Sequence, residues 1–374
     1  MGNVSLYRAS DYDYAEIYEI IEKAIISEGG AEKLFQKGKK VVIKPNLVMK
    51  KAPEYAATTH PVILDALISY LKKYTDDITV AECPGGPNTE FLLDGIFKTT
   101  GIFDVAKKHN VKLSYSMEFE KVSTKHKFSC ESFNAVKPFL EADVFINVGK
   151  LKTHALTTMT GSAKNLYGMI PGLQKVEYHA RFSALPDFCR FLLDLNTTIM
   201  PDINILDGID IMEGNGPTGG SKRHLGAILI GKNAFEVDLV AADLLGLTSS
   251  PLPLTDAAKE AGLIGDITVS GDYDEAQKIC DLILPDSKKS LIVRFPNMFG
   301  GALSRLLLPR PVINSELCKG CGECTRLCPQ KTIVFKKKKN KKVAYINKKN
   351  CIRCYCCQEL CPVKAVDTKG FFSK

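Results

Sequence analysis

The sequence lacks an apolar run long enough to span a bilayer, so no transmembrane helix is expected. It also lacks the basic-then-apolar start of a secretory signal, because acidic residues recur between Asp11 and Glu19. No G-x-x-x-x-G-K-[ST] loop occurs, which argues against P-loop nucleotide hydrolysis. We therefore expect a cytoplasmic protein without a membrane span.

The thirteen cysteines do not form the pattern of a disulfide framework. Five of them are scattered and odd in number, which is typical of a reducing compartment: Cys83, Cys130, Cys189, Cys280 and Cys356. The other eight form two copies of Cys-x-x-Cys-x-x-Cys-x-x-x-Cys-Pro, at Cys318–Pro329 and Cys351–Pro362. Nothing outside these two copies repeats.

The doubled motif has the spacing of bacterial ferredoxins, which bind two [4Fe–4S] clusters. Three closely spaced cysteines ligate one cluster, and the cysteine before proline ligates the other. The expected ligand sets are Cys318, Cys321, Cys324 and Cys361 for one cluster, and Cys351, Cys354, Cys357 and Cys328 for the second. Structural zinc, the alternative for paired Cys-x-x-Cys, requires neither the third cysteine nor the Cys-Pro pair. The motif predicts one-electron transfer.

The positive charge of the chain is concentrated around these motifs. Residues 318–374 contain 15 lysines and arginines against three acids, whereas the rest of the chain contains 35 against 39. Most of this charge lies in Lys336–Lys342, between two expected strands, Thr332–Phe335 and Val343–Ile346. These lysines either protect a sheet edge or dock an acidic electron donor of the ferredoxin or flavodoxin type. No nucleic-acid-binding motif accompanies them, so nucleic acid is not an expected partner.

Residues 1–290 show alternating strand and helix patterns, which predict an α/β fold with a mostly parallel sheet and helices on both faces. The expected strands are Val41–Lys44, Ile78–Ala81, Asp143–Val148, Ile203–Leu206 and Leu225–Ile230. The expected helices are His60–Tyr74, Phe91–Phe97, Ile102–His109, Leu185–Met200, Phe235–Leu247 and Asp256–Leu263. Residues 110–140 fit an antiparallel pair or an insertion.

The remainder of the chain divides into two parts. Residues 291–312 are apolar with few charges, and we expect a linker that docks on its own protein rather than a helix on a membrane surface. Residues 313–374 are expected to form a small α+β ferredoxin-like domain with two clusters.

Ligands of open parallel sheets bind outside the carboxyl ends of the strands, and four of the expected strands end in unusual loops. These are Pro45-Asn46, the Gly85-Gly86 turn before a helix with Asn88 as its expected N-cap, the segment from Gly149 through Lys164-Asn165, and Asp207–Gly220. Val144–Val176 contains four lysines and no acid. A one-sign stretch predicts an anionic ligand.

Roles can be assigned within these loops. His154, next to Lys152 at a strand end, is the first candidate for a general acid, with His179 as the second. Asp207 and Glu213 either bind Mg²⁺ beside a phosphate or act as turn residues. The catalytic candidates are therefore His154, Lys152 and Asp207. The candidates for binding a ligand or cofactor are Lys44, Asn46, Gly85, Gly86, Lys150, Lys164, Asn165, Glu213, Asn215 and Gly216.

Three motifs identify a family resemblance. Ile43–Leu47, Lys150–His154 with Lys164–Gly168, and Asp207–Gly208 through Glu213–Pro217 resemble the domain-of-unknown-function family three-six-two. This bacterial and archaeal family is often fused to a two-cluster ferredoxin module. The resemblance covers residues 1–280 and implies the fold and the fusion, but no reaction. Cys356, beside Cys357, and the lysine-rich hairpin depart from the ferredoxin pattern.

These observations favour an iron–sulfur oxidoreductase. Electrons from a low-potential carrier would pass through two [4Fe–4S] clusters to a small anionic substrate or organic cofactor in the α/β domain. The alternative is a non-enzymatic electron-transfer or maturation protein that serves a partner enzyme. A Mg²⁺-dependent phosphoryl transferase would leave the clusters without a role.

Overall fold

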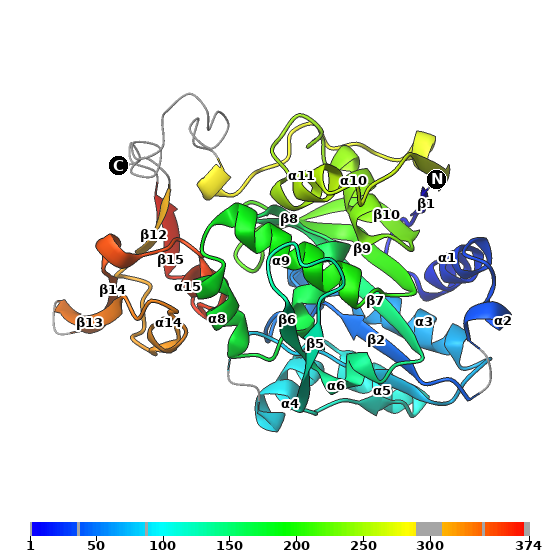
Figure 1. Cartoon of the computed structure of the whole chain (residues 1–374), viewed down its shortest axis with the longest axis horizontal. Helices are drawn as coiled ribbons and strands as arrows, with labels where there is room; N and C mark the ends of the chain where they lie inside the picture. The colour runs from blue at the N-terminus through cyan, green and yellow to red at the C-terminus, as the bar shows by residue number, and fades with distance from the viewer. Residues whose placement is uncertain (1, 36–37, 87–88, 289–308, 339–340, 370–374) are drawn as a thin grey trace.

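A computed structural model describes residues 2–35, 38–86, 89–288, 309–338 and 341–369. A nine-stranded sheet lies at the centre of the larger part of the chain (Figure 1). Its strand order is β11-β1-β10-β9-β7-β2-β3-β4, and β8 pairs with β7. The strands are β1 Gly2–Arg8, β2 Val41–Pro45, β3 Ile78–Val80, β4 Lys112–Leu113, β7 Val144–His154, β8 Thr158–Thr160, β9 Ile203–Glu213, β10 Ser221–Gly231 and β11 Ile267–Gly271.

The sheet is mostly parallel, as predicted. Strands β4, β3, β2, β7 and β9 run parallel to one another, and β11 is parallel to β1. Strand β10 pairs antiparallel with both β1 and β9 and joins the two parallel groups. A separate antiparallel pair, β5 Phe119–Ser123 and β6 Ser132–Val136, occupies residues 110–140.

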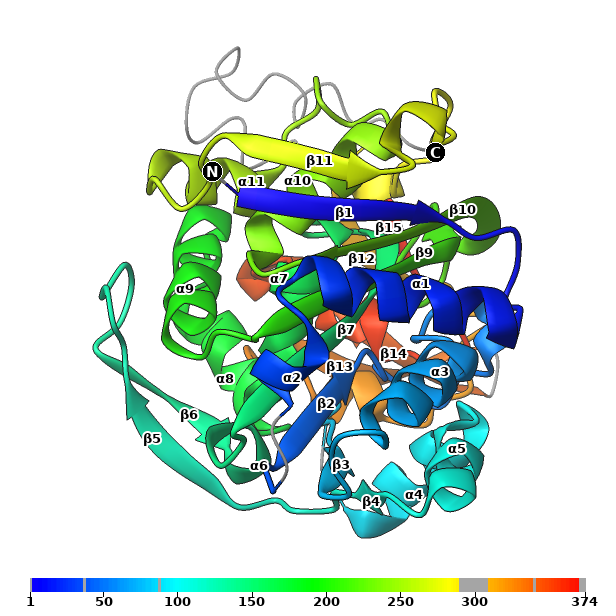
Figure 2. The same cartoon turned by 90° about the vertical axis from the view of Figure 1, so that its right-hand side faces the viewer.

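Helices cover both faces of the sheet (Figure 2), which confirms the predicted fold class. Ile43 packs with α1 and α3 on one face, whereas Val42 packs with α9 and α11 on the other. Successive side chains of a strand point to opposite faces, so a strand covered on both sides is a continuous apolar run. The α-helices of this part are α1 Tyr14–Ser27, α2 Ala31–Leu34, α3 Pro61–Leu71, α4 Glu90–Thr99, α5 Ile102–His109, α6 Lys137–Leu140, α7 Ser162–Asn165, α8 Gln174–Arg181, α9 Leu185–Thr198, α10 Ala234–Leu244 and α11 Pro253–Glu260. Short 3₁₀ segments are η1 Pro53–Tyr55, η2 Leu166–Met169, η3 Tyr273–Glu275 and η4 Asp286–Lys288.

The C-terminal part is a small α+β module with its own apolar core. Strands β12 Arg310–Ile313 and β15 Val366–Lys369 pair antiparallel, and β13 Ile333–Lys338 forms a hairpin with β14 Lys341–Ile346. Two short helices, α14 Glu323–Arg326 and α15 Cys356–Glu359, and the 3₁₀ segment η6 Lys348–Asn350 complete it. The core contains Ile333, Val343 and Ile346 together with Cys318 and Cys361.

Two strands are longer than the sequence analysis predicted. Strand β7 continues past Val148 to His154, and β9 continues past Leu206 to Glu213, so the loops expected at Gly149–His154 and Asp207–Glu213 are wrong. Polar residues normally mark loops, but these polar side chains are buried and paired inside the protein. A buried polar group is tolerated when it is hydrogen-bonded.

A helix boundary also differs. The N-cap of α4 is Thr89, whose side-chain oxygen accepts a hydrogen bond of 3.2 Å from the backbone N–H of Leu92. The predicted N-cap, Asn88, lies outside the described residues, and so does most of the predicted linker 291–312.

None of the helices in the described ranges has the length and hydropathy to cross a bilayer. The cytoplasmic location and the domain limits at residues 290 and 313 stay predictions.

Candidate functional site

A cavity of ≈ 100 Å³ lies between the α/β domain and the cluster module. Its walls come from the carboxyl ends of β2 and β3, from β7, α7, η2 and α8, and from α15 of the cluster module, which Figure 1 shows next to α8. Its polar and reactive lining side chains are those of Lys44, Asn46, Glu82, Cys83, Lys152, Thr160, Lys164, Asn165, Tyr167, Lys175, His179, Cys356 and Glu359.

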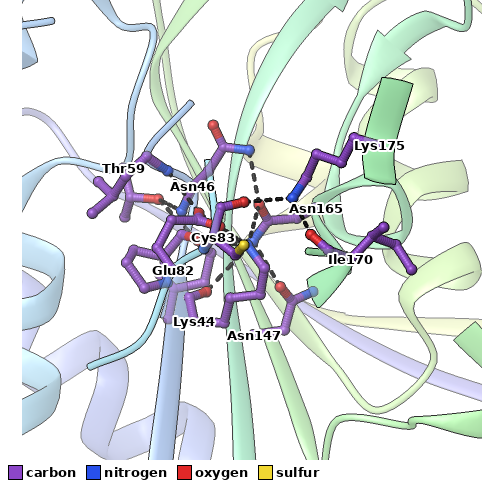
Figure 3. Close-up of polar contacts among 12 residues, drawn as sticks. Lys44, Asn46, Thr59, Glu82, Cys83, Asn147, Asn165, Ile170 and Lys175 are labelled. Carbon is purple, nitrogen blue, oxygen red and sulfur yellow. Dashed lines mark hydrogen bonds and ion pairs between the residues drawn. The ribbon is translucent and has the colours of Figure 1, made fainter. Parts of the chain in front are cut away.

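A buried ion pair forms one wall (Figure 3). The Lys44 Nζ atom lies 3.0 Å from both carboxylate oxygens of Glu82, and both side chains are buried. The same carboxylate accepts backbone N–H groups from Leu47 at 3.0 Å and Cys83 at 2.8 Å. Burial lowers the pKa of Lys44, and the Glu82 charge opposes that shift. A Cβ atom on Gly168 would lie 2.4 Å from the Lys44 Nζ, so glycine is required where η2 crosses this pair.

Lys152 is held by hydrogen bonds to two neutral oxygen atoms. Its Nζ donates to Asn46 Oδ1 at 2.7 Å and to the Ala57 carbonyl at 2.5 Å. The Asn46 amide in turn donates to Asn165 Oδ1 at 2.8 Å. Burial and the nearby Lys164 charge lower the pKa of Lys152 well below its ordinary value. None of its described hydrogen-bond partners is a carboxylate.

Lys164 is the least satisfied of the lining lysines. Its Nζ lies 6.0 Å from the centre of the Tyr167 ring, and the described residues give it no hydrogen bond or ion pair. Burial lowers the pKa of its ammonium group, and the Glu359 charge opposes that shift.

Strand register explains which predicted residues meet. Lys44 pairs with Asn147 across β2 and β7, so both side chains lie on one face, and both contact Asn165. Lys150 is three residues further along β7 and therefore lies on the opposite face. The β7–β9 register shifts between Lys150 and Lys152, and only Lys152 lines the cavity. An irregularity of this kind in strand pairing changes the direction in which the following side chains point.

Lys150 and Asp207, predicted to belong to the ligand site, form a separate buried cluster instead. The two residues are paired in register, and the Lys150 Nζ lies 2.9 Å from Asp207 Oδ2. Asp207 also accepts hydrogen bonds from the Tyr12 hydroxyl at 2.9 Å and the His60 backbone N–H at 3.0 Å. His60 is the N-cap of α3 and stacks on Tyr12. This cluster fixes α3 to the sheet, and neither charged residue lines the cavity.

His154, the predicted proton donor, lies behind the cavity wall. Its Nδ1 accepts backbone N–H groups from Leu156 at 3.0 Å and Thr157 at 3.3 Å, which places its proton on Nε2. Nε2 is 2.8 Å from Glu359 Oε1, although the pair does not have hydrogen-bond geometry. Burial lowers the pKa of His154 to about 4, so its ring is neutral near pH 7. His179, the second candidate, does line the cavity, and burial also lowers its pKa to about 4.

Most of the remaining predicted residues lie outside the cavity lining. Glu213 pairs with Arg223 at 3.3 Å, and Asn215 exchanges two hydrogen bonds with Asp286. Gly216 passes so close to Thr153 that a Cβ atom would lie 2.0 Å from its carbonyl oxygen. Gly85 lines the cavity, whereas its neighbour Gly86 does not.

The structure gives no support to magnesium binding through Asp207 and Glu213. Both carboxylates already have cationic partners. Within the ranges described above, neither Asp207 nor Glu213 belongs to a group of three side chains that could hold a metal ion.

The eight motif cysteines surround two further cavities. One is lined by Cys318, Cys321, Cys324 and Cys361, and the other by Cys328, Cys351, Cys354 and Cys357. Backbone N–H groups point at two of the sulfurs, from Ala365 to Cys361 at 3.2 Å and from Thr332 to Cys328 at 3.3 Å. Four thiols around an apolar cavity, with N–H donors to sulfur, fit a [4Fe–4S] cluster.

Cys356 lines both the cavity of the Cys351 set and the cavity between the two modules, which we call the ligand cavity. The modules also meet at Glu359, whose carbonyl oxygen accepts the Thr218 hydroxyl at 2.8 Å. The Lys364 Nζ donates to the same hydroxyl at 2.5 Å.

Sequence reasoning missed several lining residues. Glu82 lies two residues after the end of β3, so the rule that located Lys44 also applied to it. Cys356 and Glu359 lie in the other module, and no local signal connects them with the α/β domain.

The fold and site define an iron–sulfur protein with an α/β domain. The family model described as "Domain of unknown function (DUF362)" matches residues 41–243, and that of the 4Fe-4S dicluster domain matches residues 317–365. The chain therefore belongs to the DUF362 family and carries a C-terminal iron–sulfur domain, as its motifs indicated.

The chain shows moderate or low similarity to each of the following two proteins. Thylakoid-associated protein sll1697 from Synechocystis sp. (strain ATCC 27184 / PCC 6803 / Kazusa) is 29% identical over 267 residues, which cover 70% of this chain and 80% of that protein. Among solved structures, the lactate racemase apoprotein from Thermoanaerobacterium thermosaccharolyticum matches with a TM-score of 0.40 and 14% identity. That match covers 64% of this chain and 57% of the racemase chain.

Proposed function

We propose that this protein is a ferredoxin-linked oxidoreductase, in which electrons from a low-potential carrier reach a small anionic substrate in the cavity between the modules. The 4Fe-4S domain gives the chain the capacity for electron transfer. The observation that supports the rest is the position of Cys356, which lines both the cavity of the Cys351 set and the ligand cavity. A single buried residue therefore separates the second cluster from the substrate.

The protein residues have distinct tasks in this proposal. The clusters, when bound, supply electrons one at a time. Lys152 and Lys164 attract and hold the anion, while the apolar side chains of Val48 and Leu360 limit the access of water. His154 holds its proton on Nε2, which lies 2.8 Å from Glu359 Oε1 beside the cavity. Because burial lowers the pKa of His154 to about 4, its neutral ring is too weak an acid to protonate a substrate near pH 7, and we assign it the placement of Glu359 instead of the predicted general-acid role.

The experiment that tests this function is a single-turnover measurement. The holoprotein is reduced anaerobically, and the visible absorbance of its clusters is followed after small carboxylate or phosphate anions are added. We expect at least one such anion to reoxidise the clusters, and the Lys164→Gln variant to do so more slowly. Anion binding without any reoxidation would instead favour the alternative, an electron-transfer or maturation protein that serves a partner enzyme.

The role of His154 predicts a difference between two variants. In His154→Asn, the amide oxygen can still accept the N–H groups of Leu156 and Thr157, but the Nε2 proton is lost. We expect this variant to fold, to bind anions normally and to reoxidise its clusters at the wild-type rate near pH 7, because the neutral ring of His154 is not a general acid there.

The control is His154→Ala, which leaves the same two N–H groups unsatisfied. We expect it to lower the free energy of unfolding by about 1–3 kcal/mol. Reoxidation of His154→Asn that is about a hundredfold slower than that of the wild type would instead make His154 the general acid, as the sequence predicted.

The lysine-rich hairpin is the proposed docking surface for an acidic ferredoxin or flavodoxin. Two of its lysines stack on its own aromatic rings, Lys336 on Tyr345 at 3.6 Å and Lys342 on Phe335 at 3.9 Å, and these support the hairpin itself. Lys337 is exposed as well, and the described residues give it no such ring contact.

We expect replacement of Lys337, Lys338 and Lys341 by serine to slow reduction by the carrier at low ionic strength, because exposed charges act mainly on encounter rates and are screened by salt. Stopped-flow reduction rates across a salt series measure the effect. Serine at Lys107 and Lys121, exposed lysines on other elements, is the control. Equal rates for all three proteins at every salt concentration would assign the hairpin lysines to edge protection alone.

A further inference from the structure

The side chains that line the ligand cavity are unbalanced in charge. Four lysines and two glutamates contribute to the lining: Lys44, Lys152, Lys164, Lys175, Glu82 and Glu359. His179 is neutral near pH 7, because burial lowers its pKa to about 4. With all four lysines and both glutamates charged, the lining carries an excess of two positive charges, and burial opposes this excess by lowering the pKa of each lysine.

Neither glutamate forms an ion pair with Lys152, Lys164 or Lys175. Glu82 is occupied by Lys44 and two backbone N–H groups, and Glu359 lies against His154. The Lys152 donors are directed at neutral oxygens, and those of Lys175 at the carbonyls of Cys83 and Ile170. A buried charge without a counter-charge is unfavourable. An anion in the cavity would supply the missing counter-charge.

Lys164 is held in this position by buried structure. Asp238 accepts the backbone N–H groups of Ser162 at 2.5 Å and Ala163 at 3.1 Å, and so fixes the start of α7. The carboxylate can approach because residue 161 is glycine: a Cβ atom there would lie 2.1 Å from Asp238 Oδ1. A lysine without a described polar partner, on a segment anchored in this way, is arranged for a ligand.

The cavity also limits the size of that ligand. Its ≈ 100 Å³ is well below the roughly 300–1,000 Å³ of sites for drug-sized molecules, which excludes a nucleotide or flavin as the enclosed group. We infer that the site binds a compact dianion, with Lys152 and Lys164 as its counter-charges and Lys164 as the residue that selects for the second negative charge. This inference rests on the proposed function for the location of the site.

A charge series on the reduced holoprotein tests the inference by anaerobic isothermal titration calorimetry. The probes are malonate as a dianion, acetate as a monoanion and malonamide as a neutral analogue, with inorganic phosphate as the second source of a dianion. We expect malonate or phosphate to bind at least about tenfold more tightly than acetate, and malonamide not to bind. The Lys164→Gln variant should lose about 10–100-fold in dianion affinity, the scale for a hydrogen bond to a charged group, and little in acetate affinity.

The Lys121→Gln variant, changed at an exposed lysine on β5, is the control and should bind as the wild type does. Retention of the cluster absorbance shows that each variant is folded. Tighter binding of phosphate than of malonate would assign the site to phosphate-type dianions. Equal affinities for acetate and both dianions, or no binding of any anion, would overturn the inference.

This measurement does not depend on electron transfer. Dianion binding without reoxidation of the clusters would overturn the proposed oxidoreductase and leave the inference intact. Reoxidation by a neutral compound, without anion binding, would overturn the inference and leave the proposed oxidoreductase intact.

Discussion

Replacement of Cys357 by serine should remove about four of the eight irons expected in the holoprotein, whereas replacement of the adjacent Cys356 should remove none. Cys357 belongs to the set of four motif cysteines around the second cavity, and each of these thiols is needed to ligate one iron of a cube. Cys356 also lines that cavity, but it lies outside the ferredoxin spacing and faces the ligand cavity as well. Iron and sulfide analysis after anaerobic reconstitution measures both effects.

The two serine variants are matched controls for each other, since they change neighbouring residues on α15. Loss of four irons from Cys356→Ser, with full retention in Cys357→Ser, would exchange the roles of the two cysteines. Stoichiometric zinc without sulfide in the wild-type protein would contradict cluster binding altogether.

The second prediction with a large effect concerns the free energy of unfolding. Asp207→Ala should lower the free energy of unfolding by about 3–5 kcal/mol, because it leaves Lys150 charged and buried without a partner. It also removes the acceptor for the Tyr12 hydroxyl and the His60 N–H. Chemical denaturation of the reduced holoprotein under anaerobic conditions measures the change.

An exposed ion pair on the next strand provides the control. Lys222 is half-exposed and lies 2.9 Å from Asp210, so Lys222→Ala should cost less than about 1 kcal/mol. If Asp207→Ala is as mild as this control but abolishes anion binding, Asp207 belongs to the ligand site, as the sequence first suggested.

Much of the fold follows from local patterns. The apolar runs at Val41–Lys44 and Ile78–Ala81 predicted parallel strands, since only strands covered on both faces are apolar throughout. The cysteine spacing divides the eight thiols into two sets, and the same two sets surround the two cavities of the C-terminal module. Both signals are contained in a few neighbouring residues, so they do not depend on how distant parts of the chain pack.

The candidate site was only partly predictable, because two of its determinants are non-local. Lys44, Lys152 and Lys164 line one cavity, as their positions at strand ends suggested, but Lys150 and Asp207 lie elsewhere. Their position follows from the register of β7 and β9, which pairs Lys150 with Asp207 on the face of the sheet opposite Asn147. The contribution of α15 depends on how the two modules dock, and no sequence pattern encodes that arrangement.

The central claim is that the ligand cavity adjoins the cluster held by the Cys351 set. Electron paramagnetic resonance of the reduced holoprotein, with and without saturating malonate or phosphate, tests this claim most directly. We expect the bound anion to change the signal of one cluster and leave the other unchanged, and the change to disappear in Lys164→Gln. Identical spectra with and without an anion that calorimetry shows to be bound would contradict the claim.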